Sequence, residues 1–383
     1  MRHLCLALAL GLLIVLPIFA QDQPNFDDLP LGEWTRIAVP EAVCMYGTDY
    51  SFFVRPAEQP TDKLMIYFEG GGACWDGFTC ASKGQFAVAY EVTDDEMAEA
   101  TQGLFDYSNP NNPVRDYHAV FLPYCSGDVH SGASVQTFDV PPGVDTKDLN
   151  IEDGKITIQF NGFRNAASVL EWVYSNFTDP EQVFVTGCSA GGYGASTHAP
   201  FIMQHYADTE VVLLSDAANG VTPRNWSGFQ TWNIFANNPD FVPGLNGITG
   251  ERYNTTLRFR EMAKAFPQNR FAQFNTFLDS VQVFFYGLLI GTLVNEENFP
   301  QIGPRWGTQM WANTLSLETA NPNFYSYTAG GLDHCITPYD YFYEYEVQGV
   351  RFDQWVASLL DGSVSKSPTC DISLGECTRR PGS

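Results

Sequence analysis

Positive charge is scarce in this sequence. Its 383 residues include 20 Lys and Arg against 44 Asp and Glu, which gives a formal net charge of −24. A surface of that sign repels phosphate backbones and anionic lipid, so we expect no nucleic-acid partner. The same charge disfavours a polyanionic substrate, unless the binding cleft is locally basic or salt screens the repulsion.

Several common site patterns are also missing. The sequence has no Cys-x-x-Cys and no paired histidines with the spacing of zinc ligands. The glycines at 70–72 lack the Gly-Lys-Ser/Thr ending of a phosphate loop. We therefore expect neither a metal nor an organic cofactor. The 44% apolar content is that of a globular protein with a large core.

Only one long uninterrupted apolar run occurs, at residues 4–16, and the small residue Ala20 follows it. This run is too short for a comfortable membrane span and is typical of a signal peptide, which we place at residues 1–20. We expect an exported protein, secreted to the extracellular space or the periplasm, without stable membrane insertion. Residues 21–383 are predicted to form a single monomeric domain.

Removal of the signal peptide leaves eight cysteines, an even number that predicts disulfides in an exported chain. Eight thiols allow 105 connectivities, and sequence does not choose among them. Two pairs lie close in sequence: Cys74 with Cys80, and Cys370 with Cys377. The second pair would staple a tail over residues 362–383.

Short apolar runs bounded by turn residues alternate with helical patterns along the chain. The runs, at 63–69, 117–123, 182–186, 210–214, 271–276 and 324–328, are typical of strands buried on both faces of a parallel sheet. Helical patterns occupy 163–176 and the stretch after residue 189. This alternation predicts an α/β fold with a mostly parallel central sheet and helices on both faces. Residues 220–265, rich in aromatics, Asn and Pro, are expected to form a lid-like insertion over the active site.

The segment Gly187-Cys188-Ser189-Ala190-Gly191 fits the pattern Gly-x-Ser-x-Gly, directly after a β-rich run and before a helical one. That is the context of a nucleophile elbow, in which small neighbours permit a tight turn that exposes the serine hydroxyl. The alternative is an ordinary glycine-rich turn. We expect Ser189 to be a catalytic nucleophile.

A serine nucleophile needs a base and an acid, which in this architecture follow it in the order acid, then His. His334, on a loop after the last predicted strand, is the expected base, since His198 and His205 lie in the helix that leads away from Ser189. Asp279 and Asp216 each follow a strand and are both candidates for the acid. The usual strand spacing favours Asp279.

The developing oxyanion needs backbone donors. Gly70-Gly71-Gly72-Ala73 follows an early strand, where an oxyanion loop belongs. We expect the N–H groups of Gly71, Gly72 and Ala190 to form the oxyanion hole.

Five motifs occur in this chain in an order that is typical of one protein family. They are Phe68-Glu69-Gly70-Gly71-Gly72-Ala73-Cys74-Trp75, Tyr124-Cys125-Ser126-Gly127-Asp128, Gly187-Cys188-Ser189-Ala190-Gly191-Gly192, Phe277-Leu278-Asp279-Ser280 and Asp333-His334-Cys335. Together they resemble the pectin acetylesterase and Notum family over residues 34–360. The resemblance implies an α/β-hydrolase fold, ester hydrolysis and a triad of Ser189, Asp279 and His334. It also implies that Asp128 lies beside the pocket. Ala73 stands where plant members have Trp, and we expect it and Trp75 to border the acyl pocket.

These features predict a secreted serine carboxylesterase that removes short acyl groups, most simply acetyl, from a polysaccharide or glycoside. Aromatic side chains could stack on sugar rings, although packing in the core or the lid explains an aromatic content this high equally well. The candidates are Trp226, Phe229, Trp232, Trp306 and Trp311. One alternative is a Notum-like deacylase for longer acyl chains, with the apolar segment 284–293 lining its pocket. Another is a catalytically silent glycan-binding homologue.

Overall fold

A computed structural model describes residues 23–381 except 87–88, 99, 225 and 251. The predicted signal peptide lies outside the described residues. Among the helices that are described, none is both long and apolar enough to cross a membrane.

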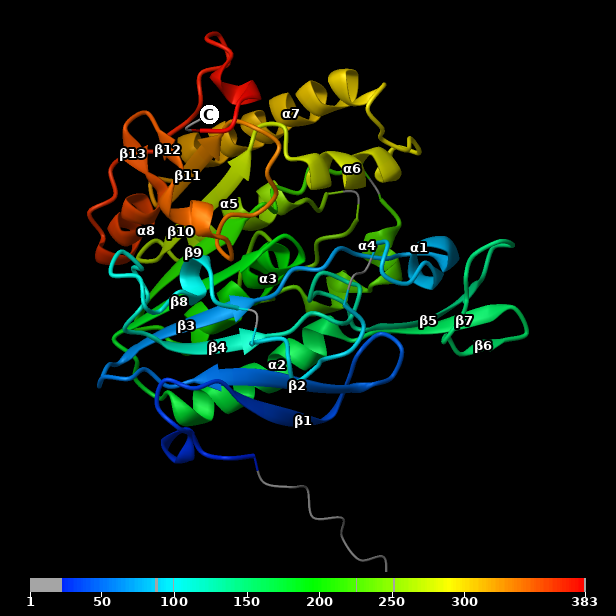
Figure 1. Cartoon of the computed structure of the whole chain (residues 1–383), viewed down its shortest axis with the longest axis horizontal. Helices are drawn as coiled ribbons and strands as arrows, with labels where there is room; N and C mark the ends of the chain where they lie inside the picture. The colour runs from blue at the N-terminus through cyan, green and yellow to red at the C-terminus, as the bar shows by residue number, and fades with distance from the viewer. Residues whose placement is uncertain (1–22, 87–88, 99, 225, 251, 382–383) are drawn as a thin grey trace, which may run out of the picture.

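An eight-stranded sheet forms the centre of the molecule (Figure 1). Its strand order is β1-β2-β4-β3-β8-β9-β10-β11, and the six strands from β4 to β11 are mutually parallel, whereas β1 and β2 pair antiparallel at one edge. The strands are β1 (Thr35–Val43), β2 (Asp49–Arg55), β3 (Lys63–Phe68), β4 (His118–Leu122), β8 (Gln182–Cys188), β9 (Glu210–Asp216), β10 (Arg270–Thr276) and β11 (Phe324–Ala329).

Eight α-helices accompany the sheet in the described part of the chain. They are α1 (Gly77–Ala81), α2 (Gly162–Asn176), α3 (Ala190–His205), α4 (Gly228–Thr231), α5 (Thr255–Ala265), α6 (Ser280–Leu289), α7 (Phe299–Ala320) and α8 (Phe352–Asp361). Short 3-10 turns lie at Phe26–Asp28, Gly103–Phe105, Ile234–Asn237, Asp340–Tyr343 and Glu376–Thr378.

Helices cover both faces of the sheet. Phe259 of α5 contacts Phe324, whereas Phe352 and Trp355 of α8 contact Tyr327. Residues 324 and 327 are an odd number apart on β11, so their side chains point to opposite faces. The two helices therefore lie on opposite sides of one buried layer, as the run of apolar strands predicts.

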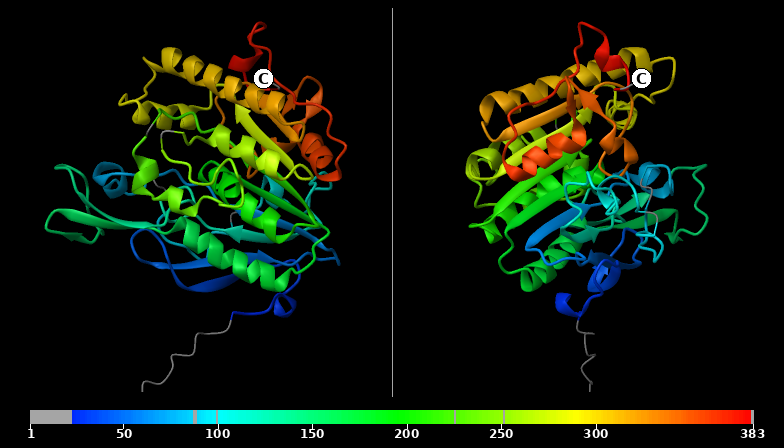
Figure 2. Two further views of the ribbon diagram at one scale, coloured as in Figure 1. Left: turned by 180° about the vertical axis from the view of Figure 1, so that it is seen from behind. Right: turned by 60° about the vertical axis from the view of Figure 1, so that its left-hand side comes forward.

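Two small sheets stand apart from the central one. The strands β5 (Ser134–Asp139), β7 (Lys155–Phe160) and β6 (Ile151–Glu152) form an antiparallel sheet that projects from the body in every view (Figures 1 and 2). The strands β12 (Glu346–Val347) and β13 (Val350–Arg351) form a hairpin just before α8.

The last part of segment 220–265 belongs to the main fold and not to the predicted insertion. Residues 255–265 form α5, which buries Phe259, Met262 and Ala263 in the main core. This helix is therefore the crossover between β9 and β10. Its polar residues obscured the periodicity, because only one stripe of the helix faces the sheet.

Four disulfides link all eight cysteines of the described chain: Cys44–Cys125, Cys74–Cys80, Cys188–Cys335 and Cys370–Cys377. The two pairs chosen by proximity in sequence are confirmed. The two long-range pairs join segments that the fold brings together.

Candidate active site

The predicted site residues all follow parallel strands at one edge of the sheet. The glycines 70–72 follow β3, Ser189 follows β8, Asp279 follows β10 and His334 follows β11. The carboxyl ends of parallel strands share an edge, which is where open α/β sheets bind their ligands. Gly70 and His334, 264 positions apart in sequence, thus lie at the same end of the parallel strands.

Ser189 occupies a strained turn between β8 and α3. Its φ of 56° and ψ of −121° fall outside the regions that side-chain-bearing residues favour. The Ser189 N–H donates to the Asp216 carbonyl at 2.8 Å, and the helix begins at the next residue. The turn has the geometry of a nucleophile elbow.

Glycine is required around this turn because the backbone of β3 approaches it closely. A Cβ on Gly191 would lie 1.9 Å from the Phe68 carbonyl oxygen, and a Cβ on Gly187 would lie 2.4 Å from the same atom. Any side chain at either position would push the turn away from β3.

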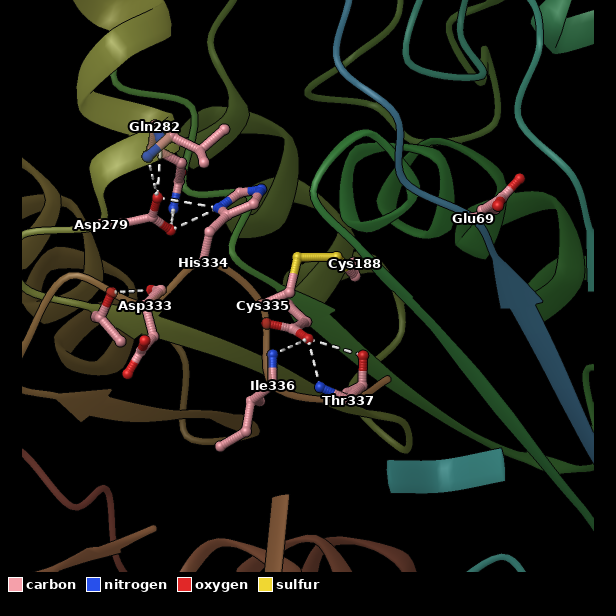
Figure 3. The surroundings of a disulfide bond; sticks show 12 residues. Glu69, Cys188, Asp279, Gln282, Asp333, His334, Cys335, Ile336 and Thr337 are labelled. Atoms are coloured by element: carbon pink, nitrogen blue, oxygen red, sulfur yellow. Dashed lines mark hydrogen bonds and ion pairs between the residues drawn. A yellow bond between two sulfur atoms is a disulfide. The ribbon is translucent and has the colours of Figure 1, made fainter. Parts of the chain in front are cut away.

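His334 is held by Asp279. Its Nδ1 lies 2.9 Å from both carboxylate oxygens of Asp279, which is fully buried (Figure 3). A carboxylate only accepts, so Nδ1 carries the proton and Nε2 keeps its lone pair. The Nε2 atom is buried without a hydrogen-bond partner among the described residues. This is the tautomer that a general base requires.

Asp279 is oriented by α6, whose N-terminus it caps. Its Oδ1 accepts from the backbone N–H groups of Val281 and Gln282 at 3.1 and 2.8 Å, and its Oδ2 accepts from Gln282 Nε2 at 2.9 Å. Sequence reasoning missed Gln282, although Asp279-Ser280-Val281-Gln282 has the spacing of a capping box.

Burial disfavours the imidazolium of His334, but the charge and hydrogen bond of Asp279 and the charge of Asp216 outweigh that effect. The pKa of His334 is therefore raised above its ordinary value of 6.5. The site stabilises the cation that proton abstraction from a serine would create.

Asp216, the second candidate acid, has a different role. Its Oδ2 accepts from the backbone N–H groups of Ile336 and Thr337, at 2.9 and 2.8 Å, and from the Thr337 hydroxyl at 2.7 Å. Burial raises its pKa to about 6, against the opposing effect of these hydrogen bonds. Asp216 anchors the loop that carries His334 and does not hydrogen-bond the imidazole.

The Cys188–Cys335 disulfide connects the residue before Ser189 to the residue after His334 (Figure 3). It spans 147 residues of sequence and ties the end of β8 to the loop after β11. Both sulfur atoms are consumed in this bond, so they and His334 do not make a metal site, although their ligand atoms lie within 4.8 Å of one another. The even number of cysteines predicted disulfides, but the sequence did not identify the partner of Cys188.

A cavity of about 110 Å³ contains Ser189, Ala190 and His334 in its lining. No hydrogen bond joins the described side chains of Ser189 and His334. Such bonds are often long before substrate binds and tighten in the reacting complex. The rest of the lining includes nine aromatic residues, which are Trp75, Tyr193, Trp226, Phe229, Trp232, Tyr253, Phe285, Tyr286 and Trp306.

The glycines after β3 differ in position. Gly72 lines the cavity with a φ of +77°, and an added Cβ would lie 1.8 Å from the Phe86 carbonyl oxygen. Gly71 lies behind the described lining, where an added Cβ would be 2.7 Å from the Tyr124 ring. Of the three residues predicted to supply oxyanion donors, Gly72 and Ala190 line the cavity, whereas Gly71 is not in its described lining.

Ala73 and Trp75 line the cavity as expected, whereas Asp128 does not. Asp128 is fully buried, and its carboxylate accepts from the Ser126 hydroxyl at 2.6 Å and from the Gly162 N–H at 2.8 Å. Burial raises its pKa to about 6, against the effect of these bonds. It binds the start of α2 behind the cavity wall, and the neighbouring Val129 reaches the lining instead.

Part of segment 220–265 does lie over the site. Trp226, Phe229, Trp232 and Ile234 line the cavity. The Trp226 ring packs edge-on against Trp75, with 5.3 Å between the ring centroids. Trp306 also lines it. Trp311 does not appear in the described lining and packs beside the apolar cluster of α6 and α7 instead.

Residues 33–285 match the family described as Pectinacetylesterase. A curated relative, the palmitoleoyl-protein carboxylesterase NOTUM of Schmidtea mediterranea, is 28% identical over 158 residues, which are 39% of this chain and 26% of that protein. The chain thus spans about a quarter of that relative's length. The structure of the Wnt deacylase Notum from Drosophila aligns with a TM-score of 0.59 over 87% of this chain and 94% of the other, at 14% identity. At that identity the likeness concerns the fold, which is of the α/β-hydrolase type.

Proposed function

Because the chain belongs to the pectinacetylesterase family, a family of carboxylic ester hydrolases, we propose that it is a serine esterase that removes short acyl groups from a saccharide. Ser189, His334 and Asp279 would form its triad. The observation that carries the proposal is the pairing of His334 Nδ1 with a buried Asp279, which leaves Nε2 without a hydrogen-bond partner in a residue that lines the same cavity as Ser189.

The chemistry follows from these positions. The Ser189 oxygen attacks the ester carbonyl while His334 Nε2 accepts its proton, and the same nitrogen then protonates the departing alcohol. Water, activated by His334, hydrolyses the acyl-enzyme and restores Ser189. Asp279 keeps Nδ1 protonated and stabilises the imidazolium. The N–H groups near Gly72 and Ala190 would stabilise the oxyanion, where each donor contributes about 3 kcal/mol.

Cavity size favours a short acyl group. A cavity of about 150 Å³ holds a benzene molecule, and the one beside Ser189 has about 110 Å³. An acetyl group fits that space, which supports a short acyl group. A deacylase for longer chains is the second candidate, since Phe285 and Leu289 of α6 contribute apolar surface to the lining.

Four disulfides are typical of proteins that fold in an oxidising compartment. They support the proposal that the protein is exported and acts on an extracellular or periplasmic ester.

Hydrolysis of p-nitrophenyl esters from acetate to palmitate tests the proposal. We expect acetate to be cleaved best, and Ser189→Ala to lower kcat by at least about 10⁴-fold with an unchanged circular dichroism spectrum. An optimum at long chains would favour the second candidate. If neither wild type nor variant cleaved any ester, the protein would be a binding homologue without catalysis.

A further inference from the structure

Glu69 lies directly after β3 and directly before the glycine loop 70–72 (Figure 3), and the proposed chemistry does not use its side chain. Its backbone N–H donates to the Leu122 carbonyl at 3.0 Å, and its own carbonyl accepts from His130 Nε2 at 2.9 Å. Its carboxyl Oε2 accepts from the Tyr124 N–H at 2.8 Å. Glu69 therefore joins the end of β3 to the segment after β4 through both its backbone and its side chain.

Tyr124 in turn supports the glycine loop. A Cβ on Gly71 would lie 2.7 Å from the Tyr124 ring, so the ring packs directly against the Gly71 backbone. The Tyr124 hydroxyl accepts from the Val129 N–H at 2.8 Å, and Val129 lines the Ser189 cavity. A shift of Tyr124 would move both the glycine loop and one wall of the cavity. The bond between Glu69 and Tyr124 therefore bears on the position of the predicted oxyanion donors.

A second carboxyl group meets Glu69 from a distant part of the chain. Glu96 belongs to segment 92–97, both ends of which are buried in the main core. An ion pair between Arg36 of β1 and Asp94 also holds this segment. The segment presents the Glu96 carboxyl group to Glu69, and the two carboxyl groups hydrogen-bond each other.

Two ionised carboxylates cannot form such a bond, because each of them only accepts. One proton must therefore lie between Glu69 and Glu96. The surroundings agree, since Glu96 Oε2 is buried and receives no hydrogen bond from an N–H or hydroxyl group of the described residues. Burial raises the pKa of Glu69 well above its ordinary value, and the charge of Glu96 raises it further. The pair keeps its proton at a pH where an ordinary glutamic acid has lost it.

The other ionisable groups that face the pair do not titrate over the same pH range. His130 is neutral, since burial lowers its pKa to about 4. Tyr50 of β2 and Tyr67 of β3 are also neutral, because burial raises their pKa well above 10. Arg36 stays charged, and its charge favours the ionised form of Glu96. The shared proton is therefore the one that alkaline pH removes.

We propose that Glu69 and Glu96 are positioning residues of the oxyanion loop, and that they hold this loop in place only while they share a proton. The inference rests on the proposed function, because it assigns the loop to ester hydrolysis. When the proton is lost, two anions face each other in a buried site and repel. Segment 92–97 is held at both ends, so Glu69 moves and displaces the glycine loop. Loss of an oxyanion donor lowers kcat about 100-fold, so activity should fall at alkaline pH.

The pH dependence of kcat on p-nitrophenyl acetate from pH 5 to 9 tests the proposal. We expect wild type to lose at least about tenfold in kcat toward pH 9. Glu69→Gln should keep its kcat there, because its amide oxygen still accepts from Tyr124 and its amide NH₂ donates permanently to Glu96. Glu96→Gln supplies the same donor from the other side, and it serves if Glu69→Gln does not fold.

Glu91→Gln is the matched control. Glu91 is exposed just before segment 92–97, so this variant removes the same charge without touching the pair and should keep the alkaline loss of wild type. A pH profile of Glu69→Gln and Glu96→Gln that equals that of wild type would overturn the proposal. So would a Glu91→Gln profile without the alkaline loss, since general charge would then explain the effect.

Hydrogen exchange provides a readout that does not depend on turnover. Mass spectrometry follows the peptide that contains residues 69–74 in wild type and in Glu69→Gln at the same pH. The exchange rate of wild type relative to the variant should rise about tenfold between pH 6 and pH 9. A ratio that does not change with pH would mean that the loop stays in place, and the proposal would be wrong.

The two measurements separate this inference from the proposed function. If esters are cleaved but wild type and Glu69→Gln share one pH profile, the positioning role fails and the esterase stands. If the loop of wild type alone opens at alkaline pH and no ester is cleaved at any pH, the esterase fails and the carboxyl pair stands.

Discussion

His334 lies between two buried carboxylates that act on it differently. Asp279 touches Nδ1, while Asp216 contributes only its charge and holds the following loop. A base with a raised pKa is protonated, and therefore inactive, up to a higher pH than an ordinary histidine. Since the His334 imidazolium is favoured in the folded state, the His334–Asp279 pair stabilises the protein below pH 6.5. That contribution is lost as pH rises through the folded-state pKa of His334.

Asp279→Asn should lower kcat about 10⁴-fold, because an amide favours the wrong tautomer of His334. The acid limb of the pH profile should move to lower pH, since burial then lowers the pKa of His334 with less opposition. Steady-state kinetics on p-nitrophenyl acetate from pH 5 to 9 measure both effects.

Asp216→Asn is the matched control. An asparagine oxygen can still accept from Ile336 and Thr337, so kcat should stay within about tenfold of wild type. A larger loss in Asp216→Asn than in Asp279→Asn would assign the acid to Asp216.

Gly72 has no room for a side chain. Gly72→Ala would place a Cβ against the Phe86 carbonyl, and the loop would have to move away from the cavity. We expect kcat to fall about 100-fold through a misplaced oxyanion donor, with a smaller change in KM.

Gly154→Ala controls for backbone strain. Gly154 has a φ of +72°, nothing lies within 4 Å of its Cβ position, and it belongs to the projecting sheet. This variant should lose about 1 kcal/mol of stability and keep its kinetics. If Gly72→Ala and Gly154→Ala lost the same amount of kcat, the oxyanion role proposed for Gly72 would be contradicted.

Among the elements, the ends of β8 and β11 depend on each other. They are separated by β9 and β10 in the sheet, yet Cys188–Cys335 joins them beside Ser189 and His334. The bond constrains the distance between the proposed nucleophile and base more directly than the sheet does.

Replacing Cys188 and Cys335 by Ala should reduce kcat more than it reduces binding, because the two loops can then separate. Loop-closure entropy also predicts a loss of about 5 kcal/mol of stability for a 147-residue loop. Kinetics below the Tm of the variant distinguish the two effects.

The tail disulfide provides the comparison. Cys370–Cys377 closes only 7 residues, and its removal should cost about 2 kcal/mol and leave kcat near wild type. If both double variants lost kcat equally, the Cys188–Cys335 bond would have no special role in positioning.

At the scale of the whole molecule, net charge opposes folding. A charge of −24 at pH 7 produces self-repulsion that salt screens over about 8–10 Å. Every 1 kcal/mol of relieved repulsion should raise Tm by about 2 °C in a chain of this size.

We therefore expect Tm at pH 7 to rise when sodium chloride is added, and this gain to vanish near pH 4.4, where the net charge is zero. Differential scanning calorimetry at both pH values tests the expectation. A Tm at pH 7 that did not respond to salt would mean that the charges are already locally compensated.

Much of the fold was predictable because its signals are local. Each of the six parallel strands is an apolar run bounded by turn residues, and the elbow lies in one short segment. His334 was identified by elimination, since only three histidines follow Ser189 and two of them lie in α3.

The remaining features depend on contacts between distant segments. Asp216 and Asp279 both follow strands, so sequence could favour one acid but not exclude the other. Asp128 sits in a motif beside the pocket, and only packing revealed that it faces α2.

By itself, then, the sequence determined the order of the site residues along the chain. A glycine loop, a serine elbow, an acid and a histidine follow one another, each at the end of an apolar run. The tertiary structure decided which acid meets the histidine, which cysteines pair, and that Glu96 meets Glu69 beside the glycine loop. The physical reason is that propensity and hydrophobic pattern act over a few residues, whereas crossovers between parallel strands bring together side chains tens of residues apart.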